Sequence, residues 1–132
     1  MSKLIDAVDG TLVVDVDGTL CGLKQADQSY DEILPNPAML IKLQEYRDKG
    51  YRVLLYTARN MRTYEGNMGL INRHTVPQLL DWLERWKVPY DEILFGKPWP
   101  RSRGFYIDDR AIRPDEFLRM TEQEVHALLG QE

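Results

Sequence analysis

Short apolar runs that alternate with segments of helical spacing constrain the fold of this chain most strongly. The runs cover residues 11–16, 51–56 and 91–95 and are rich in Val, Leu and Ile. Runs of this length and composition are typical of strands buried inside a sheet. Because strands that alternate with helices favour parallel pairing, we expect an α/β fold with a mostly parallel sheet.

Two helices are predicted between these runs. Asn36 can cap the first helix, with Pro37 at its first position and Gly50 beyond its end. The second should begin after Thr75 and end before Pro89. Their apolar faces are expected to contain the following residues: Met39, Leu40, Leu43 and Tyr46 or Arg47, then Val76, Leu79, Leu80, Leu83 and Trp86.

The last third of the chain predicts a fourth strand and a final helix. Residues 104–107 form a very short apolar run, and Thr121 with Glu124 has the spacing of a capping box. The near-repeat of residues 16–20 at residues 8–12 lacks a preceding apolar strand, so we interpret it as a turn. With 132 residues and no linker, residues 1–132 are expected to form a single domain.

Charge and cysteine content limit the classes of function. Lys and Arg number 17 against 21 Asp and Glu, and this net charge of -4 argues against binding to a nucleic acid backbone. Cys21 is the only cysteine, so no intramolecular disulfide can form, and we expect a cytoplasmic protein. The apolar run at Met1–Asp6 is too short for a signal peptide or a membrane span.

Reactive side chains follow each of the four predicted strands. Asp15 and Asp17 lie at the end of the first, Thr57 follows the second and Lys97 the third, while a pair of aspartates, 108 and 109, follows the fourth. Any one of them alone would be read as a turn former or a surface charge. Ligands of open parallel sheets bind beyond the carboxyl ends of the strands, so together they predict a site there. The polar segments 21–34 and 59–73 also follow strands and are expected to surround it.

These residues, in this order, resemble the four motifs of the haloacid dehalogenase (HAD) superfamily. The motifs are Asp-Val-Asp-Gly-Thr-Leu at 15–20, Thr-Ala-Arg at 57–59, Lys-Pro at 97–98 and Asp-Asp at 108–109. The resemblance spans almost the entire chain. It implies a three-layer α/β/α Rossmann-like core. Because segments 21–34 and 59–73 are short, it also implies that no large cap domain is present.

The resemblance further implies phosphatase chemistry. Asp15 would attack phosphorus to form an aspartyl-phosphate, and Asp17 would act as general acid and base. Thr57 would donate its hydroxyl to the phosphoryl group, and Lys97 would balance its charge. The resemblance also implies a substrate-binding set that consists of Gly18, Thr19, Ala58 and Arg59.

Magnesium is the metal that the resemblance implies. Its expected ligands are a carboxylate oxygen of Asp15, the backbone carbonyl of Asp17 and the carboxylate of Asp108, which are hard oxygen donors. Asp109 would support these ligands without touching the metal, although it could exchange roles with Asp108. Arg59 could bind a second anionic group of the substrate, or it could pair with a nearby acid such as Asp109.

The sequence at residues 57–67, 90–98 and 106–110 is similar to that of small HAD proteins of bacterial capsule and polysaccharide biosynthesis. This suggests a phosphorylated sugar or sugar acid as substrate. A polynucleotide end phosphatase is a second interpretation, since several arginines could form a local basic rim. A catalytically silent binding module is a third. Finally, we expect a homo-oligomer, because Trp82 lies beside the main apolar stripe of its helix and should stay partly exposed.

Overall fold

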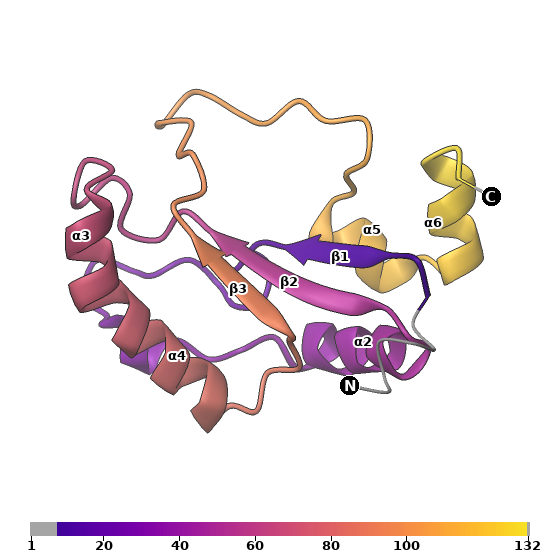
Figure 1. The fold of residues 1–132 in the computed structure, drawn as a ribbon, viewed down its shortest axis with the longest axis horizontal. Helices are drawn as coiled ribbons and strands as arrows, with labels where there is room; N and C mark the ends of the chain where they lie inside the picture. Colours follow the sequence, from indigo (N-terminus) through magenta and orange to yellow (C-terminus); the bar gives the residue numbers. More distant parts are fainter. Residues whose placement is uncertain (1–7, 132) are drawn as a thin grey trace. The chain divides into compact units, whose positions relative to one another are not determined.

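The computed structural model describes residues 8–131, in which contacts divide the chain into two compact units. The units are Met1–Trp99 and Pro100–Glu132, and each has its own secondary structure (Figure 1). The expectation of a single domain over residues 1–132 stays a prediction. The prediction made for Met1–Asp6 lies outside the described residues.

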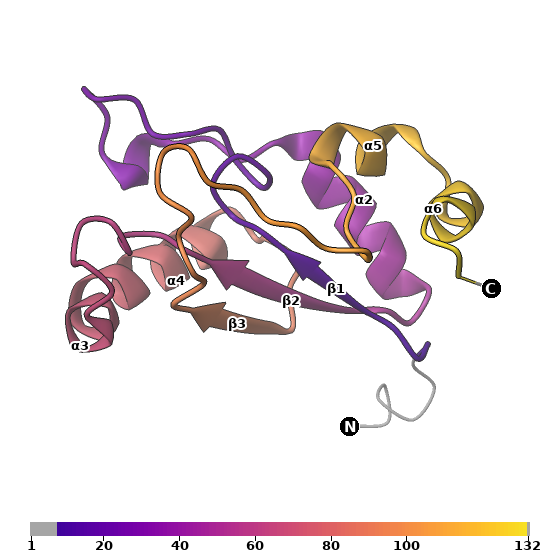
Figure 2. The same ribbon diagram turned by 90° about the horizontal axis from the view of Figure 1, so that it is seen from above.

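The first unit contains a parallel sheet of three strands. These are β1 (Thr11–Val14), β2 (Arg52–Thr57) and β3 (Glu92–Phe95), hydrogen-bonded in the order β1-β2-β3. In both ribbon views the three arrowheads point to the same side (Figure 1 and Figure 2). The α/β fold class with a parallel sheet is therefore confirmed, and the carboxyl ends of all three strands lie at one edge.

The sheet packs against α2 (Pro37–Asp48). Burial alternates along β2, where Val53, Leu55 and Thr57 are buried and the residues between them are half-buried. As predicted, Asn36 caps α2, because its side chain accepts hydrogen bonds from the backbone N–H groups of the second and third helical residues. One face of β2 is therefore buried, and α2 packs against this strand.

The second helical region begins earlier than predicted. It consists of α3 (Met68–Leu70), a five-residue π-helical turn (Ile71–Thr75) and α4 (Val76–Arg85). The predicted loop over residues 59–73 is therefore wrong for its second half. Asn67 starts the helix by accepting a hydrogen bond from the N–H of Leu70, and the π-helical turn buries its first and last side chains. This burial results from tertiary packing, so the local sequence does not predict it.

Trp82 is buried, contrary to the prediction. Its side chain lies on the inner face of α4 with 1% of its surface exposed, and its indole N–H donates to the carbonyl of Ile33 at 2.8 Å. Leu80 and Trp86, which we placed on that inner face, are each 37% exposed. The observation that led us to expect a homo-oligomer is thus overturned, and oligomerisation stays a prediction without it.

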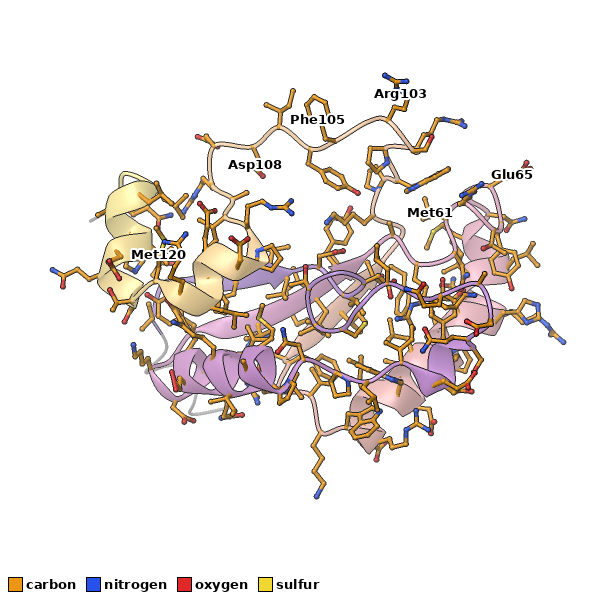
Figure 3. All side chains as sticks on the ribbon, turned by 180° about the vertical axis from the view of Figure 1, so that it is seen from behind. Met61, Glu65, Arg103, Phe105, Asp108 and Met120 are labelled. Carbon is orange, nitrogen blue, oxygen red and sulfur yellow. The ribbon has the colours of Figure 1, made fainter. Side chains whose placement is uncertain are left out.

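The second unit contains α5 (Pro114–Arg119) and α6 (Glu122–Leu128). The capping box of Thr121 and Glu124 is confirmed at the start of α6. The strand predicted over residues 104–107 is wrong, because this segment is irregular. Gly104 donates its N–H to the carbonyl of Pro100 at 3.1 Å, which closes a turn instead of extending the chain. Figure 3 shows Phe105 and Asp108 on this irregular segment before α5.

Helix α5 itself was not predicted. Its signals are Pro114 at the first position and Glu116, whose carboxylate accepts the backbone N–H of Arg113 at 2.8 Å. Within residues 8–131, no helix is both long enough and apolar enough to cross a membrane.

Candidate active site

Asp15 and Lys97 meet at the carboxyl edge of the sheet. Asp15 directly follows β1, and Lys97 comes two residues after β3, beyond Gly96 with its positive φ of 84°. The backbone N–H of Lys97 donates to the carbonyl of Thr57 at 3.0 Å, which fixes the chain after β3 to the end of β2. The Lys97 ammonium nitrogen lies 3.6 Å from Oδ1 of Asp15. The structure thus brings together two residues that the sequence placed at separate strand ends.

The carboxyl of Asp15 lies in an environment that disfavours its ionised form, chiefly because it is partly buried. Burial raises its pKa above the usual range, the charge of Lys97 acts in the opposite direction, and the charge of Asp17 adds to the rise. The net direction is upward, although the side chain is still 35% exposed. The ionised form would therefore be stabilised by a further cation at this position.

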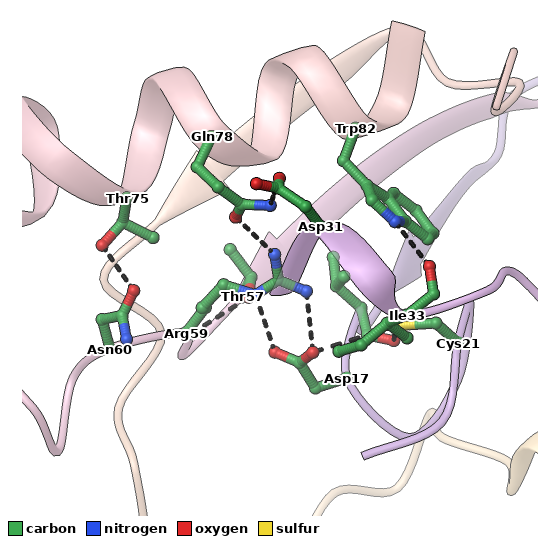
Figure 4. A network of polar contacts seen from close by, with 11 residues as sticks. Asp17, Cys21, Asp31, Ile33, Thr57, Arg59, Asn60, Thr75, Gln78 and Trp82 are labelled. Carbon is green, nitrogen blue, oxygen red and sulfur yellow. Dashed lines mark hydrogen bonds and ion pairs between the residues drawn. The ribbon is translucent and has the colours of Figure 1, made fainter. Parts of the chain in front are cut away.

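Asp17 is bound by Arg59 through two hydrogen bonds. Nε of Arg59 donates to Oδ2 of Asp17 at 3.2 Å, and Nη2 donates to Oδ1 at 2.8 Å (Figure 4). Gly18, with a φ of 88°, allows the chain to turn directly after Asp17, and its N–H donates to the carbonyl of Cys21. The Arg59 side chain is 1% exposed and that of Asp17 is 24% exposed. This pair is therefore shielded from water on the arginine side.

The other groups around Arg59 complete its environment. Nη1 donates to Oε1 of Gln78 on α4 at 2.9 Å, and Nε2 of Gln78 donates to Oδ1 of Asp31 at 3.0 Å. The guanidinium carbon lies 4.1 Å from the ring centre of Tyr30, in the short 3-10 helix Tyr30–Glu32. Sequence reasoning found neither Tyr30 nor Gln78, since no motif marks them.

The position of Arg59 bears on the two roles considered for it. We expected either a grip on substrate or a pair with a nearby acid, and in the first unit the acid that it binds is Asp17. Its three donor nitrogens are already engaged by Asp17 and Gln78. Direct binding of substrate by Arg59 stays a prediction, and this geometry does not favour it.

Thr57 ends β2 with a buried side chain, 1% exposed. Its Oγ1 accepts the backbone N–H of Arg59 at 3.1 Å, across Ala58. Since a hydroxyl can accept and donate at once, this bond leaves the O–H of Thr57 available as a donor. Gly18 and Thr19 occupy the turn after Asp17, where the N–H of Thr19 donates to the carbonyl of Val16.

Metal-binding groups are only partly gathered. Among residues 8–131 there is no cluster of three or more His, Cys, Asp or Glu side chains that could hold a metal ion. The first unit supplies the Asp15 carboxylate and, because the Asp17 carboxylate is bound to Arg59, the Asp17 backbone carbonyl. These hard oxygen donors fit magnesium. Asp108 and Asp109 belong to the second unit, where Oδ1 of Asp108 accepts the N–H of Arg110 at 2.8 Å. Their part in a metal site stays a prediction.

Comparison with known proteins defines a close structural relative. The fold is similar to a crystal structure of a structural-genomics target from Vibrio cholerae, with 50% sequence identity and a TM-score of 0.87. The match covers 92% of this chain and 97% of that one. The relative is described without an activity, so it supports the α/β fold and assigns no reaction.

Two further structures match at a lower level. They are chains of a Pnkp1/Rnl/Hen1 complex and of a Pnkp1/Rnl/Hen1 RNA repair complex, each at 24% identity and a TM-score of 0.46. The matches cover 83% of this chain and 33% and 31% of those chains, which is too little similarity to carry an argument here. No protein-family model and no curated protein matches the chain.

Proposed function

We propose that this protein is a magnesium-dependent phosphatase of the HAD type that hydrolyses a small phosphate monoester. The observation that carries the proposal is the position of Asp15 at the carboxyl edge of a parallel sheet, 3.6 Å from the Lys97 ammonium group. Asp17, two residues later, supplies a second carboxylate held in a fixed orientation by Arg59. A nucleophile, a positive charge for the phosphoryl group and a proton-transfer group are thus neighbours, as phosphoryl transfer requires.

In the first step, a carboxylate oxygen of Asp15 attacks phosphorus and the bond from phosphorus to the leaving oxygen breaks. The carboxyl of Asp17 gives its proton to that oxygen, so the alcohol leaves neutral. Lys97 balances negative charge on the phosphoryl oxygens, and Thr57 donates its hydroxyl to one of them. The product is an aspartyl-phosphate on Asp15.

In the second step, water attacks the same phosphorus and Asp17 accepts the proton that the water loses. The bond from phosphorus to the Asp15 oxygen breaks, which releases inorganic phosphate and restores the carboxylate. Asp17 ends the cycle protonated, as it began. The two steps share one acid and one base, so no other proton carrier is needed.

Magnesium fits the groups of the first unit and would be held by Asp15, the backbone carbonyl of Asp17 and, in this proposal, Asp108. When bound, it supplies positive charge that neutralises the phosphoryl oxygens and the crowded carboxylates. The Asp15 carboxylate and the Asp17 backbone carbonyl are hard oxygen donors of the kind that magnesium prefers, which supports this assignment.

For the substrate we propose a phosphorylated sugar or sugar acid, on the resemblance to small HAD proteins of polysaccharide biosynthesis. A polynucleotide end phosphatase is the second candidate, favoured by Arg62 and Arg73, which are exposed in the segment after β2. The net charge of -4 counts against it. A silent binding module would keep the fold and have no turnover.

Phosphate release tests the proposal. Purified protein should release phosphate from p-nitrophenyl phosphate with magnesium, lose this activity with excess EDTA, and lose it again in Asp15→Asn with an unchanged circular dichroism spectrum. Wild-type activity that survives in Asp15→Asn would reject the mechanism. A panel of sugar phosphates, sugar-acid phosphates and a 3′-phosphorylated oligonucleotide then separates the substrate classes, and no turnover of any of them would favour the silent module.

A further inference from the structure

The contacts of the Asp17 carboxylate distinguish its two oxygens. Oδ1 accepts the shorter Arg59 bond, 2.8 Å from Nη2, and also lies 3.8 Å from the Cys21 thiol, which donates to it. Oδ2 accepts one hydrogen bond from the described part of the chain, the 3.2 Å bond from Nε. A carboxylate oxygen can accept two hydrogen bonds, so Oδ2 keeps a lone pair for another partner.

The orientation of Arg59 is itself fixed from two further directions. Gln78 on α4 accepts a hydrogen bond from Nη1 (Figure 4), and the ring centre of Tyr30 lies 4.1 Å from the guanidinium carbon. Gln78 is in turn held by Asp31, so the arginine contacts two elements that are distant in sequence. A guanidinium held on several sides loses little freedom when it binds a carboxylate, because its planar geometry is preorganised.

We infer that Arg59 is a positioning residue, which holds Asp17 so that Oδ2 exchanges the proton with the leaving oxygen and with water. Gln78 and Tyr30 keep the guanidinium in the orientation that this requires. The inference rests on the proposed phosphatase function and assigns Arg59 to proton transfer instead of substrate recognition. No part of the arginine needs to touch substrate.

The two roles of Arg59 differ in how activity depends on the leaving group. A general acid matters most when the leaving oxygen is strongly basic and matters little when it is weakly basic. If Arg59 positions Asp17, its loss should slow substrates with poor leaving groups far more than those with good ones. If Arg59 instead binds a second anion of the substrate, aryl phosphates that lack such an anion should all respond equally.

The experiment measures kcat/KM for a series of aryl phosphates of equal charge and graded leaving-group pKa, for wild type and Arg59→Lys. Lysine keeps the charge but cannot form the two-oxygen contact. We expect a loss of about 10- to 100-fold for the poorest leaving group and less than about 3-fold for the best, within the range that general acids contribute. An equal loss along the series would overturn the inference.

A double-substitution cycle with Asp17 provides the second readout. In the Asp17→Asn background, Arg59→Lys should change kcat/KM by less than about 2-fold, because the group that it positions no longer transfers protons. Losses that multiply would mean that Arg59 acts independently of Asp17, which would also overturn the inference. Gln78→Leu removes the hydrogen bond between Gln78 and Nη1 of Arg59 while leaving the Arg59–Asp17 pair intact. It should also slow substrates with poor leaving groups more than those with good ones.

Arg52→Lys serves as the matched control for these variants. Arg52 also binds a carboxylate through Nε and Nη2, at 3.2 and 2.8 Å from Glu92, but on the exposed surface near the amino ends of β2 and β3. It should leave the leaving-group dependence unchanged. Circular dichroism and urea midpoints confirm folding of each variant.

The failure of the proposed function can be told apart from the failure of this inference. A wild type without magnesium-dependent turnover would reject the proposed function. An active wild type, with an Arg59→Lys loss that is the same for all leaving groups, rejects this inference alone.

Discussion

The ammonium group of Lys97 lies 3.6 Å from Oδ1 of Asp15, across a sheet edge at which β2 separates their strands. The hydrogen bond from the Lys97 N–H to the Thr57 carbonyl keeps the lysine backbone in place, so the side chain reaches over β2 to the aspartate. The charge of Lys97 lowers the pKa of Asp15 against the larger effect of burial. Lys97 therefore serves both the nucleophile and, in the proposed reaction, the phosphoryl group.

Lys97→Met should lower kcat for phosphate release by about 100-fold or more, since it removes the positive charge nearest the reacting carboxylate. Steady-state release from p-nitrophenyl phosphate measures the effect. Lys87→Met, at an exposed lysine after α4, is the control and should keep wild-type activity. A Lys97 variant that keeps more than about a tenth of wild-type kcat would contradict this role.

Asp17→Asn and Asp108→Asn should separate proton transfer from metal binding. Asp17 is expected to contribute only its backbone carbonyl, because its carboxylate is bound to Arg59, so Asp17→Asn should retain magnesium affinity within about 3-fold while losing turnover. Asp108→Asn should weaken magnesium binding by about 10-fold or more. Isothermal titration with magnesium alone measures both. Equal losses of affinity would refute the division of roles.

Asp91 should make stability depend on pH in acid. Burial alone would raise its pKa, but hydrogen bonds from the Val53 N–H and from Arg47, with that arginine's charge, lower it overall. A lowered pKa contributes stability above the unfolded value of about 3.9, and this contribution is lost as the pH falls through the folded value. Asp91→Asn should therefore be less stable by about 1–3 kcal/mol at pH 7, and this gap should narrow as the pH falls from 7 to 3, below the unfolded value.

Urea unfolding at both pH values measures this difference. Asp81→Asn, which removes an exposed acid from α4, controls for the loss of one negative charge. A gap between Asp91→Asn and wild type that stays constant from pH 7 to pH 3 would show that the Asp91 carboxylate is not stabilised in its ionised form.

The Cys21 thiol should be unreactive in the folded protein. Its side chain is 3% exposed, and burial raises its pKa to about 12, with the charge of Asp17 adding to the rise and that of Arg59 opposing it. Alkylation requires the thiolate. Iodoacetamide at pH 8 should therefore modify native protein at least about 100-fold more slowly than urea-unfolded protein, as followed by intact mass. Comparable rates in the two states would disprove the burial.

The sequence predicted those parts of the fold that depend on local signals. Asn36 with Pro37 and Thr121 with Glu124 are capping patterns whose hydrogen bonds join neighbouring residues, and both appear as expected. The three apolar runs at residues 11–16, 51–56 and 91–95 likewise contain the three strands. Residues 104–107 failed because a strand also requires a ladder of hydrogen bonds to another strand, which composition does not supply.

The sequence predicted which residues belong to the candidate site better than it predicted which of them contact one another. Strand order brings Asp15 and Lys97 to one edge, so their meeting follows from the motifs and the parallel sheet. The partner of Arg59 could not be chosen from sequence, because several acids lie within reach of so long a side chain. The burial of Trp82 was missed because the partner of its indole N–H, the Ile33 carbonyl, is 49 residues away in the sequence.

The attachment of residues 30–33 to α4 bears on where this chain can tolerate insertions. Cys21 forms a β-bridge with Pro35 and thereby joins the two ends of the 21–34 segment. Arg85 on α4 donates to the carbonyl of Asp31, near the carboxyl-terminal end of this segment, at 2.8 Å. Residues 22–29, mostly exposed, thus form a loop closed between fixed anchors. Doubling the length of such a loop costs only about 0.6 kcal/mol in closure entropy. Residues 22–29 are therefore a place where the chain can lengthen while the anchored residues on either side keep their contacts.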